Sequence, residues 1–192
     1  MRNWKNTARV AILFWGLGLP RAFAEDTVPA SSRALLLLRA LAFDRKLPAK
    51  LGENVVVAIG YRKGNSSSES CQKEMSTALE AAAAKSTVAG KPVKAASVPY
   101  SAGSFQSDLE AAKAVSLYLC PGLEDELPSI VKLTRSRSLL TFTGQESYVD
   151  AGVSIGFVLR GTKAAIVVNL PAAKAEGADL DAALLTRSEV RK

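Results

Sequence analysis

Short β-branched runs alternate along this chain with segments of helical spacing, and this alternation is the strongest limit on its fold. Residues 54–61 (NVVVAIGY) form a continuous apolar run between Gly52 and Gly64, which is typical of a strand buried on both faces. The next apolar residues share one face of a helix for which Ser68 is a suitable N-cap: Cys71, Met75, Ala78, Leu79 and Ala82. The stretch therefore predicts a strand followed by a packed helix.

The same alternation continues through most of the chain. Further strands are expected at 93–100, 115–120 and 138–143, and helices at 34–43, after Ser104 and around 123–134, where Pro128 can move the start of the helix. Segments 153–160 and 164–169 are separated by three residues and predict an antiparallel hairpin. A helical turn at 171–176 and a terminal helix at 180–187 should follow. The predicted fold is a single α/β domain with a mostly parallel sheet and helices on both faces.

The first 24 residues have the three parts of a secretory signal peptide. Arg2, Lys5 and Arg9 precede an apolar stretch at 10–19, and Ala22-Phe23-Ala24 forms an A-x-A cleavage site. The apolar stretch is shorter than the 18 or more residues that a membrane span needs, which favours cleavage over anchoring. The expected mature protein is a 25–192 domain in an exported compartment, with no stable membrane insertion after cleavage.

Composition excludes several classes of function. The net charge of +7 depends on four basic residues of the signal, and the mature chain has 21 basic and 18 acidic residues, or +3. No basic stripe with interleaved aromatic residues supports nucleic-acid binding. Because the chain has no histidine, it can form neither a Ser-His-Asp triad nor a histidine-containing zinc site. We therefore expect neither an enzyme nor a metal or other cofactor. Glu124-Asp125-Glu126 is interpreted as a solvated surface near a helix N-terminus.

One edge of the predicted sheet is the natural place for a ligand or a partner. Open α/β sheets bind ligands where the carboxyl ends of their strands meet. The side chains at or just after these strand ends are Tyr61, Arg62, Ser66, Tyr100, Ser101, Thr143 and Gln145. The Ser-rich loop at 60–68 lacks the spacing of a phosphate-binding loop, although weak anion binding at the helix start stays open. The 143–146 loop is either part of this edge or a plain connection.

Three stretches resemble the YfiR-like family of periplasmic proteins. They are the run ALLLLRALAFDRKL…GENVVVAIGYRKGNSSSESCQKEM, the segment LYLCPGLEDEL and the C-terminal pattern that runs from Gly152 to Leu185. The resemblance implies a periplasmic regulator that binds and restrains the periplasmic part of an inner-membrane diguanylate cyclase, which lowers cyclic-di-GMP output. The strand order is also similar to one lobe of periplasmic solute-binding proteins, so a small-molecule binder without enzymatic activity is the alternative. A second copy of the chain is a further candidate partner.

The two cysteines predict a disulfide. Cys71 falls near the start of a helix and Cys120 ends a strand, and the first and third strands of a doubly wound sheet are commonly neighbours. Both thiols would then lie near the same edge in an oxidising compartment. The alternative is a pair of buried core thiols, which is a common state for free cysteine.

Overall fold

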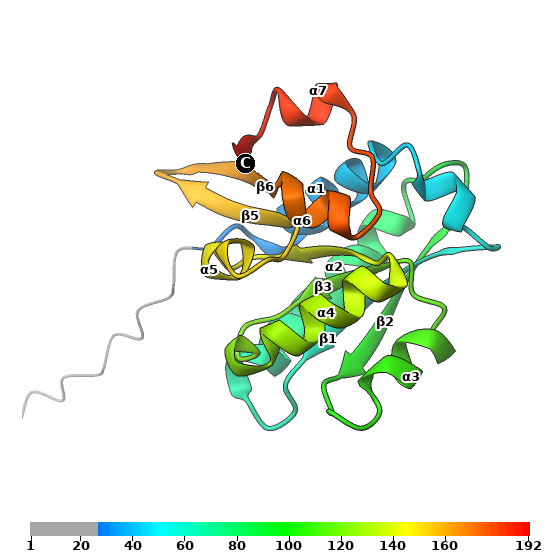
Figure 1. The fold of residues 1–192 in the computed structure, drawn as a ribbon, viewed down its shortest axis with the longest axis vertical. Helices are drawn as coiled ribbons and strands as arrows, with labels where there is room; N and C mark the ends of the chain where they lie inside the picture. The colour runs from blue at the N-terminus through cyan, green and yellow to red at the C-terminus, as the bar shows by residue number, and fades with distance from the viewer. Residues whose placement is uncertain (1–26) are drawn as a thin grey trace, which may run out of the picture.

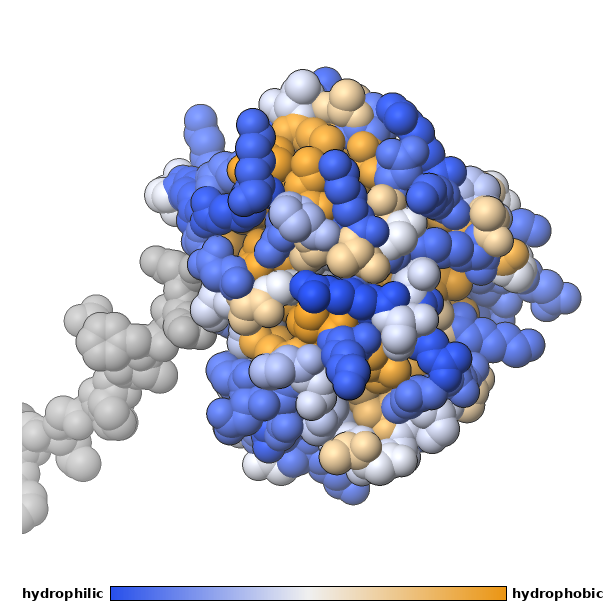
Figure 2. All heavy atoms as spheres, viewed as in Figure 1, coloured by the Kyte–Doolittle hydropathy of each residue, from blue (hydrophilic) through white to orange (hydrophobic). Residues whose placement is uncertain are grey.

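The computed structural model describes residues 27–192 (Figure 1). The signal peptide predicted at residues 1–24 lies outside this part of the chain. No helix of the described part is long and apolar enough to cross a membrane. On the face shown in Figure 2, apolar side chains form several patches that charged and polar side chains separate.

The described residues form a seven-stranded sheet in the order β2-β1-β3-β4-β5-β6-β7. The first five strands in this order are parallel, β6 is antiparallel to β5, and β7 is parallel to β6. The strands are β1 (Val55–Tyr61), β2 (Val93–Pro99), β3 (Ser116–Leu119), β4 (Leu140–Thr143), β5 (Ile155–Arg160), β6 (Lys163–Asn169) and β7 (Glu189–Arg191). The predicted parallel sheet with a C-terminal hairpin is confirmed.

Helices cover both faces of this sheet, as expected for parallel strands. The helices are α1 (Ala30–Ala42), α2 (Ser66–Ala83), α3 (Phe105–Ala111), α4 (Leu127–Arg137), α5 (Glu146–Asp150), α6 (Leu170–Ala175) and α7 (Ala182–Leu185). Two short 3-10 helices lie at Leu47–Lys50 and Glu124–Glu126. In Figure 1, α3, α4 and α5 lie in front of the sheet, and α1 and α2 lie behind it.

Alternation along the strands divides the core between the two faces. In β3, Tyr118 joins the cluster of buried residues under α1 and α2, whereas Leu117 and Leu119 join the cluster under α3 and α4. In β1, Ile59 faces the first cluster and Ala58 the second. Successive residues of a strand point to opposite faces, so a strand buried on both sides needs the continuous apolar run that the sequence shows.

Local details differ from the sequence prediction at three places. Asn65, not Ser68, caps α2, because Asn65 Oδ1 accepts a hydrogen bond of 3.0 Å from the Ser68 backbone N–H. The segment after Gln145 forms the short helix α5, which was not predicted. The terminal helix predicted at 180–187 is wrong in extent: only Ala182–Leu185 is helical, and β7 follows it. Pro128 lies in the first turn of α4, as the predicted shift requires.

Ion pairs hold β7 at the outer edge of the sheet. The Arg160 guanidinium pairs with Glu146 at 2.6 Å and with Glu189 at 2.8 Å. Arg191 pairs with the same Glu146 at 2.7 Å and lies 3.5 Å from Asp150. These side chains join β5, β7 and α5 into one exposed charged network, which compensates for the short length of the strand.

A buried carboxyl group joins α6 to the centre of the sheet. Glu176, directly after α6, is fully buried, and its oxygens accept hydrogen bonds from Thr134 Oγ1 at 2.8 Å and from the Thr141 backbone N–H at 2.9 Å. The hydroxyl groups of Thr141 and Ser154 also donate to it. Burial raises the pKa of Glu176, and the hydrogen bond from Ser154 opposes this shift. The Glu176 carboxyl group therefore links α4, β4 and the end of α6 through hydrogen bonds.

Replacing Glu176 with alanine should destabilise the domain by about 2–4 kcal/mol, because several buried donors lose their acceptor. Urea unfolding followed by circular dichroism measures this loss. Glu53→Ala, at an exposed loop position, is the control and should change stability by less than about 0.5 kcal/mol.

Glu176→Gln tests the ionisation of the same group. Because the pKa of Glu176 is higher in the folded state than in the unfolded state, its contribution to stability is fully present at low pH. This contribution is lost as the pH rises through the folded-state pKa. Glutamine does not ionise, so the stability of Glu176→Gln relative to the native protein should improve as the pH rises. A difference that does not change with pH would contradict the raised pKa.

Candidate functional site

The predicted edge exists, because the parallel strands end side by side. Tyr61 in β1 is paired with Pro99 in β2, Gly60 with Leu119 in β3, and Leu119 with Thr143 in β4. The loops after β1 and β2 lie together at the bottom of Figure 1. We call the loops that follow β1, β2, β3 and β4 the carboxyl edge.

Arg62 links two loops of the carboxyl edge. Its backbone N–H donates to Ser68 Oγ at 2.8 Å, its Nε donates to the Gly122 carbonyl oxygen, and its Nη2 pairs with Glu126 at 2.7 Å. Both charged side chains are partly buried. Arg62 therefore holds the loop after β1 against the loop after β3, and its charge is already paired.

The acidic run beside Arg62 is more than a solvated surface. Glu126 binds Arg62, and Glu124 Oε1 accepts a hydrogen bond of 2.8 Å from the Tyr148 hydroxyl. The same hydroxyl oxygen accepts from the Leu123 backbone N–H at 2.8 Å. Hydrogen bonds from its own backbone N–H and from Tyr148 outweigh burial and lower the pKa of Glu124. Glu124 and Asp125 are exposed and the run directly precedes α4, as the sequence indicated, and the contacts of Glu124 and Glu126 with facing loops add to that interpretation.

The other predicted edge residues have different surroundings. Thr143 is fully buried, and its Oγ1 donates to the Leu119 carbonyl at 3.1 Å and accepts from the Gln145 N–H at 3.1 Å. The Tyr100 ring packs on Phe105, with centroids 5.1 Å apart. Tyr61 is half-buried, whereas Ser66 and Ser101 are exposed.

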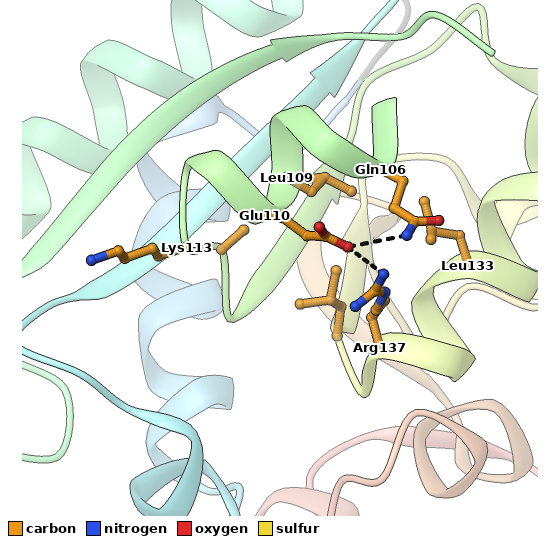
Figure 3. Close-up of a pocket in the computed structure, with 8 residues that line it drawn as sticks. Gln106, Leu109, Glu110, Lys113, Leu133 and Arg137 are labelled. Atoms are coloured by element: carbon orange, nitrogen blue, oxygen red, sulfur yellow. Dashed lines mark hydrogen bonds and ion pairs between the residues drawn. The ribbon is translucent and has the colours of Figure 1, made fainter. Parts of the chain in front are cut away.

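Hollows near these residues are small and separate. Tyr100 lines one between α3 and α4, and Gln145 lines another beside Val28 and Phe157. A third, between α3 and the end of α4, has a volume of about 190 Å³ (Figure 3). There Glu110 accepts from Gln106 at 3.0 Å and pairs with Arg137. Pockets that bind drug-sized ligands have volumes of roughly 300–1,000 Å³. The edge residues share one side of the sheet but do not line a common cavity.

A buried guanidinium group lies beneath the carboxyl edge. Arg33 of α1 is only 6% exposed, and its Nη1 donates to the Tyr118 hydroxyl at 2.6 Å. Its Nη2 lies 3.8 Å from the exposed Glu74, and its Nε has no hydrogen-bond partner. A Cβ atom at Gly144 would lie 2.9 Å from Arg33 Nη1 and 3.1 Å from the Tyr118 hydroxyl. A side chain at position 144 would therefore have to displace the Arg33 guanidinium or the Tyr118 hydroxyl.

The sequence prediction missed Arg33, because the helix was expected to begin at residue 34. A signal was present: Arg33, Leu37 and Leu41 are spaced four residues apart, and all three are buried on one face of α1. A charged residue in register with a buried face indicates a polar group in the core.

Both cysteines belong to the cluster around Arg33. Cys71 in α2 and Cys120 after β3 are buried free thiols in the structure, and Cys71 Sγ lies 4.0 Å from Arg33 Nη1. The expected pairing of the first and third strands is confirmed. A hydrogen bond from Cys120 lowers the pKa of Cys71, burial opposes this, and the charge of Arg33 adds to the lowering. Burial raises the pKa of Cys120. Of the two thiols, Cys71 is the one that lies beside the Arg33 guanidinium.

A disulfide between Cys71 and Cys120 stays a prediction. In protein purified from the periplasm without reductant, the expected mass is two hydrogens below that of the dithiol, and neither cysteine should react with iodoacetamide after denaturation. Closing a loop of about 50 residues should add roughly 3–4 kcal/mol of stability, measured against Cys71→Ser/Cys120→Ser. Two alkylatable thiols in the denatured, unreduced protein would end this prediction.

The described residues contain no group of three or more cysteine and acidic side chains placed to hold a metal ion. They form an α/β domain whose mostly parallel sheet is covered by helices on both faces. The chain belongs to the YfiR/HmsC-like family, whose model matches residues 42–189. No curated protein matches it.

Solved structures show the same fold at low sequence identity. An ABC domain from Streptococcus pneumonia, solved in complex with L-Trp, has a TM-score of 0.59 and 15% identity, over 84% of this chain and 61% of that one. A conserved domain protein from Vibrio cholerae has a TM-score of 0.59 and 16% identity, over 85% of this chain and 60% of that one. The chain thus spans about three fifths of the length of these structures. At this identity, the likeness concerns the fold alone.

Proposed function

We propose that the mature protein is a periplasmic regulator that binds and restrains the periplasmic part of an inner-membrane diguanylate cyclase. Membership of the YfiR/HmsC-like family is the observation that carries this proposal. YfiR-like proteins are periplasmic regulators, and the predicted signal peptide fits that compartment. In this proposal the protein acts by contact and not by catalysis, which agrees with the absence of histidine from its sequence.

The geometry of the carboxyl edge favours contact with a protein over enclosure of a ligand. Arg62 and Thr143 use their polar groups within the chain, so these groups would have to exchange partners before binding a small molecule. Ser101 is exposed on the loop after β2, and Ser66 is exposed in the first turn of α2. We place the partner contact on this outer surface of the carboxyl edge.

Deletion of the gene should raise cellular cyclic-di-GMP and matrix production, and the native gene should restore both.

Ser66→Trp and Ser101→Trp place bulky side chains on the proposed contact and should weaken binding to the cyclase periplasmic domain by about tenfold, or ~1.4 kcal/mol. Calorimetry or surface plasmon resonance with the purified periplasmic domain measures this loss.

Lys85→Trp is the matched control, because Lys85 is exposed just beyond the far end of α2. It should bind like the native protein. Unchanged cyclic-di-GMP after deletion, together with no binding to the cyclase domain, would overturn the proposal. Equal losses for all three tryptophan variants would remove the contact from the carboxyl edge but leave the regulatory function.

A small-molecule binder is the second candidate function, and the likeness to a domain solved with L-Trp supports it. L-Trp at a hundredfold excess over its Kd would stabilise the fold by ~2.7 kcal/mol, which raises the Tm of a domain of this size by roughly 5–10 °C. Differential scanning fluorimetry with L-Trp, and with L-alanine as the control, tests this candidate. A Tm that stays constant to millimolar L-Trp would exclude that ligand.

A further inference from the structure

The outer edge of β2 is open along its centre. Val55 N–H donates to the Pro92 carbonyl at 2.9 Å, and Tyr100 N–H donates to the Tyr61 carbonyl at 2.7 Å, which fixes the residues of β2 that bond to β1. Because bonding direction alternates along a strand, the N–H and C=O groups of Val93, Ala95 and Ser97 point away from β1. No backbone hydrogen bond in the described part of the chain uses these six groups.

At both ends of this edge, the backbone groups are not available for pairing with another strand. At one end, Lys91 exchanges two backbone hydrogen bonds with Val88, at 2.9 and 3.0 Å, so its N–H and C=O are occupied. At the other end, Pro99 has no N–H to donate. The groups available for pairing therefore belong to Val93, Ala95 and Ser97, a set that is symmetric about Ala95.

We propose that β2 pairs antiparallel with β2 of a second copy of this chain, about a two-fold axis at Ala95. In this register Ala95 faces Ala95 of the other copy, Val93 faces Ser97, and all outward N–H and C=O groups of both edges form hydrogen bonds. A shift centred on Val93 would place the occupied Lys91 opposite Ala95. A shift centred on Ser97 would place Pro99 there. Of these three registers, only the one centred on Ala95 pairs all the outward groups of the edge.

Side chains near β2 fit the same arrangement. Gln72 Nε2 donates to Ser97 Oγ at 2.6 Å, which places this part of α2 over the Ser97 end of the edge. Glu80 lines a shallow hollow with Val93, Lys94 and Ala95. The two-fold axis would bring the Glu80 end of one α2 beside the Gln72 end of the other α2. Lys73 directly follows Gln72, so an acidic and a basic residue would come from the two copies at this place. Lys94 falls opposite Ala96, so the pairing opposes no like charges.

Cysteine cross-linking tests the register directly. In a hydrogen-bonded antiparallel pair, the two Ala95 Cα atoms would be ~5.5 Å apart, a separation that a disulfide spans. Ala95→Cys should therefore give a covalent dimer under mild oxidation, visible on a non-reducing gel. Ser97→Cys is the control: it is more exposed, but it would lie roughly 14 Å from its own copy and should stay monomeric on the gel. Equal cross-linking of the two variants, or none for Ala95→Cys, would overturn the proposal.

Light scattering of the mature protein provides a second test. The native chain should have the mass of a dimer, and Ala95→Pro should weaken the dimer at least about tenfold, since the Ala95 N–H bonds only the second copy. Circular dichroism checks that the variant stays folded. A native protein that is monomeric at all concentrations, or a folded Ala95→Pro protein that remains dimeric, would contradict β2 pairing whatever the outcome of the cyclase experiments.

Discussion

The pairing of β1 with β3 is the interaction on which the rest of this structure depends. Here the strand order reverses direction, since β2 lies on one side of β1 and β3 and β4 follow on the other. The loops after β1 and β3 are brought into contact, which allows Arg62 to bind Gly122 and Glu126. The same pairing places Cys71, Cys120 and Tyr118 around Arg33. In doubly wound sheets this position is usually a ligand crevice, but here the chain fills it with its own side chains.

Much of the fold could be predicted from sequence, because the strands are buried on both faces and the period of the apolar residues changes at each element. The 54–61 run and the helical face from Cys71 to Ala82 are clear cases. The errors concern short elements without a periodic signal. The five-residue helix α5 packs on β5, where a Cβ at Gly156 would lie 2.5 Å from Val149 Cγ2. The three-residue β7 depends on ion pairs with Arg160 and Glu146, which are distant in sequence.

The positions of the candidate site residues could be predicted from the sequence, but their burial and their hydrogen bonds could not. Parallel strands must present their carboxyl ends at one edge, so Tyr61, Tyr100 and Thr143 had to lie there. Sequence could not show that Thr143 is fully buried, or that Glu124 binds the Tyr148 hydroxyl. Those contacts join segments 24 residues apart in each case. A helical face containing Arg33 was the one local sign of a polar core.

The ion-paired strand β7 has a consequence for how many copies can share one sheet. Arg160, Glu189 and Arg191 place charged side chains around the last strand, and β7 is only three residues long. Charge and short length both disfavour the addition of a further strand at an edge. The β2 edge can accept a further strand and the β7 edge cannot. Pairing through β2 therefore ends with two molecules. The charged side chains around β7 would thus prevent the growth of fibres through strand pairing.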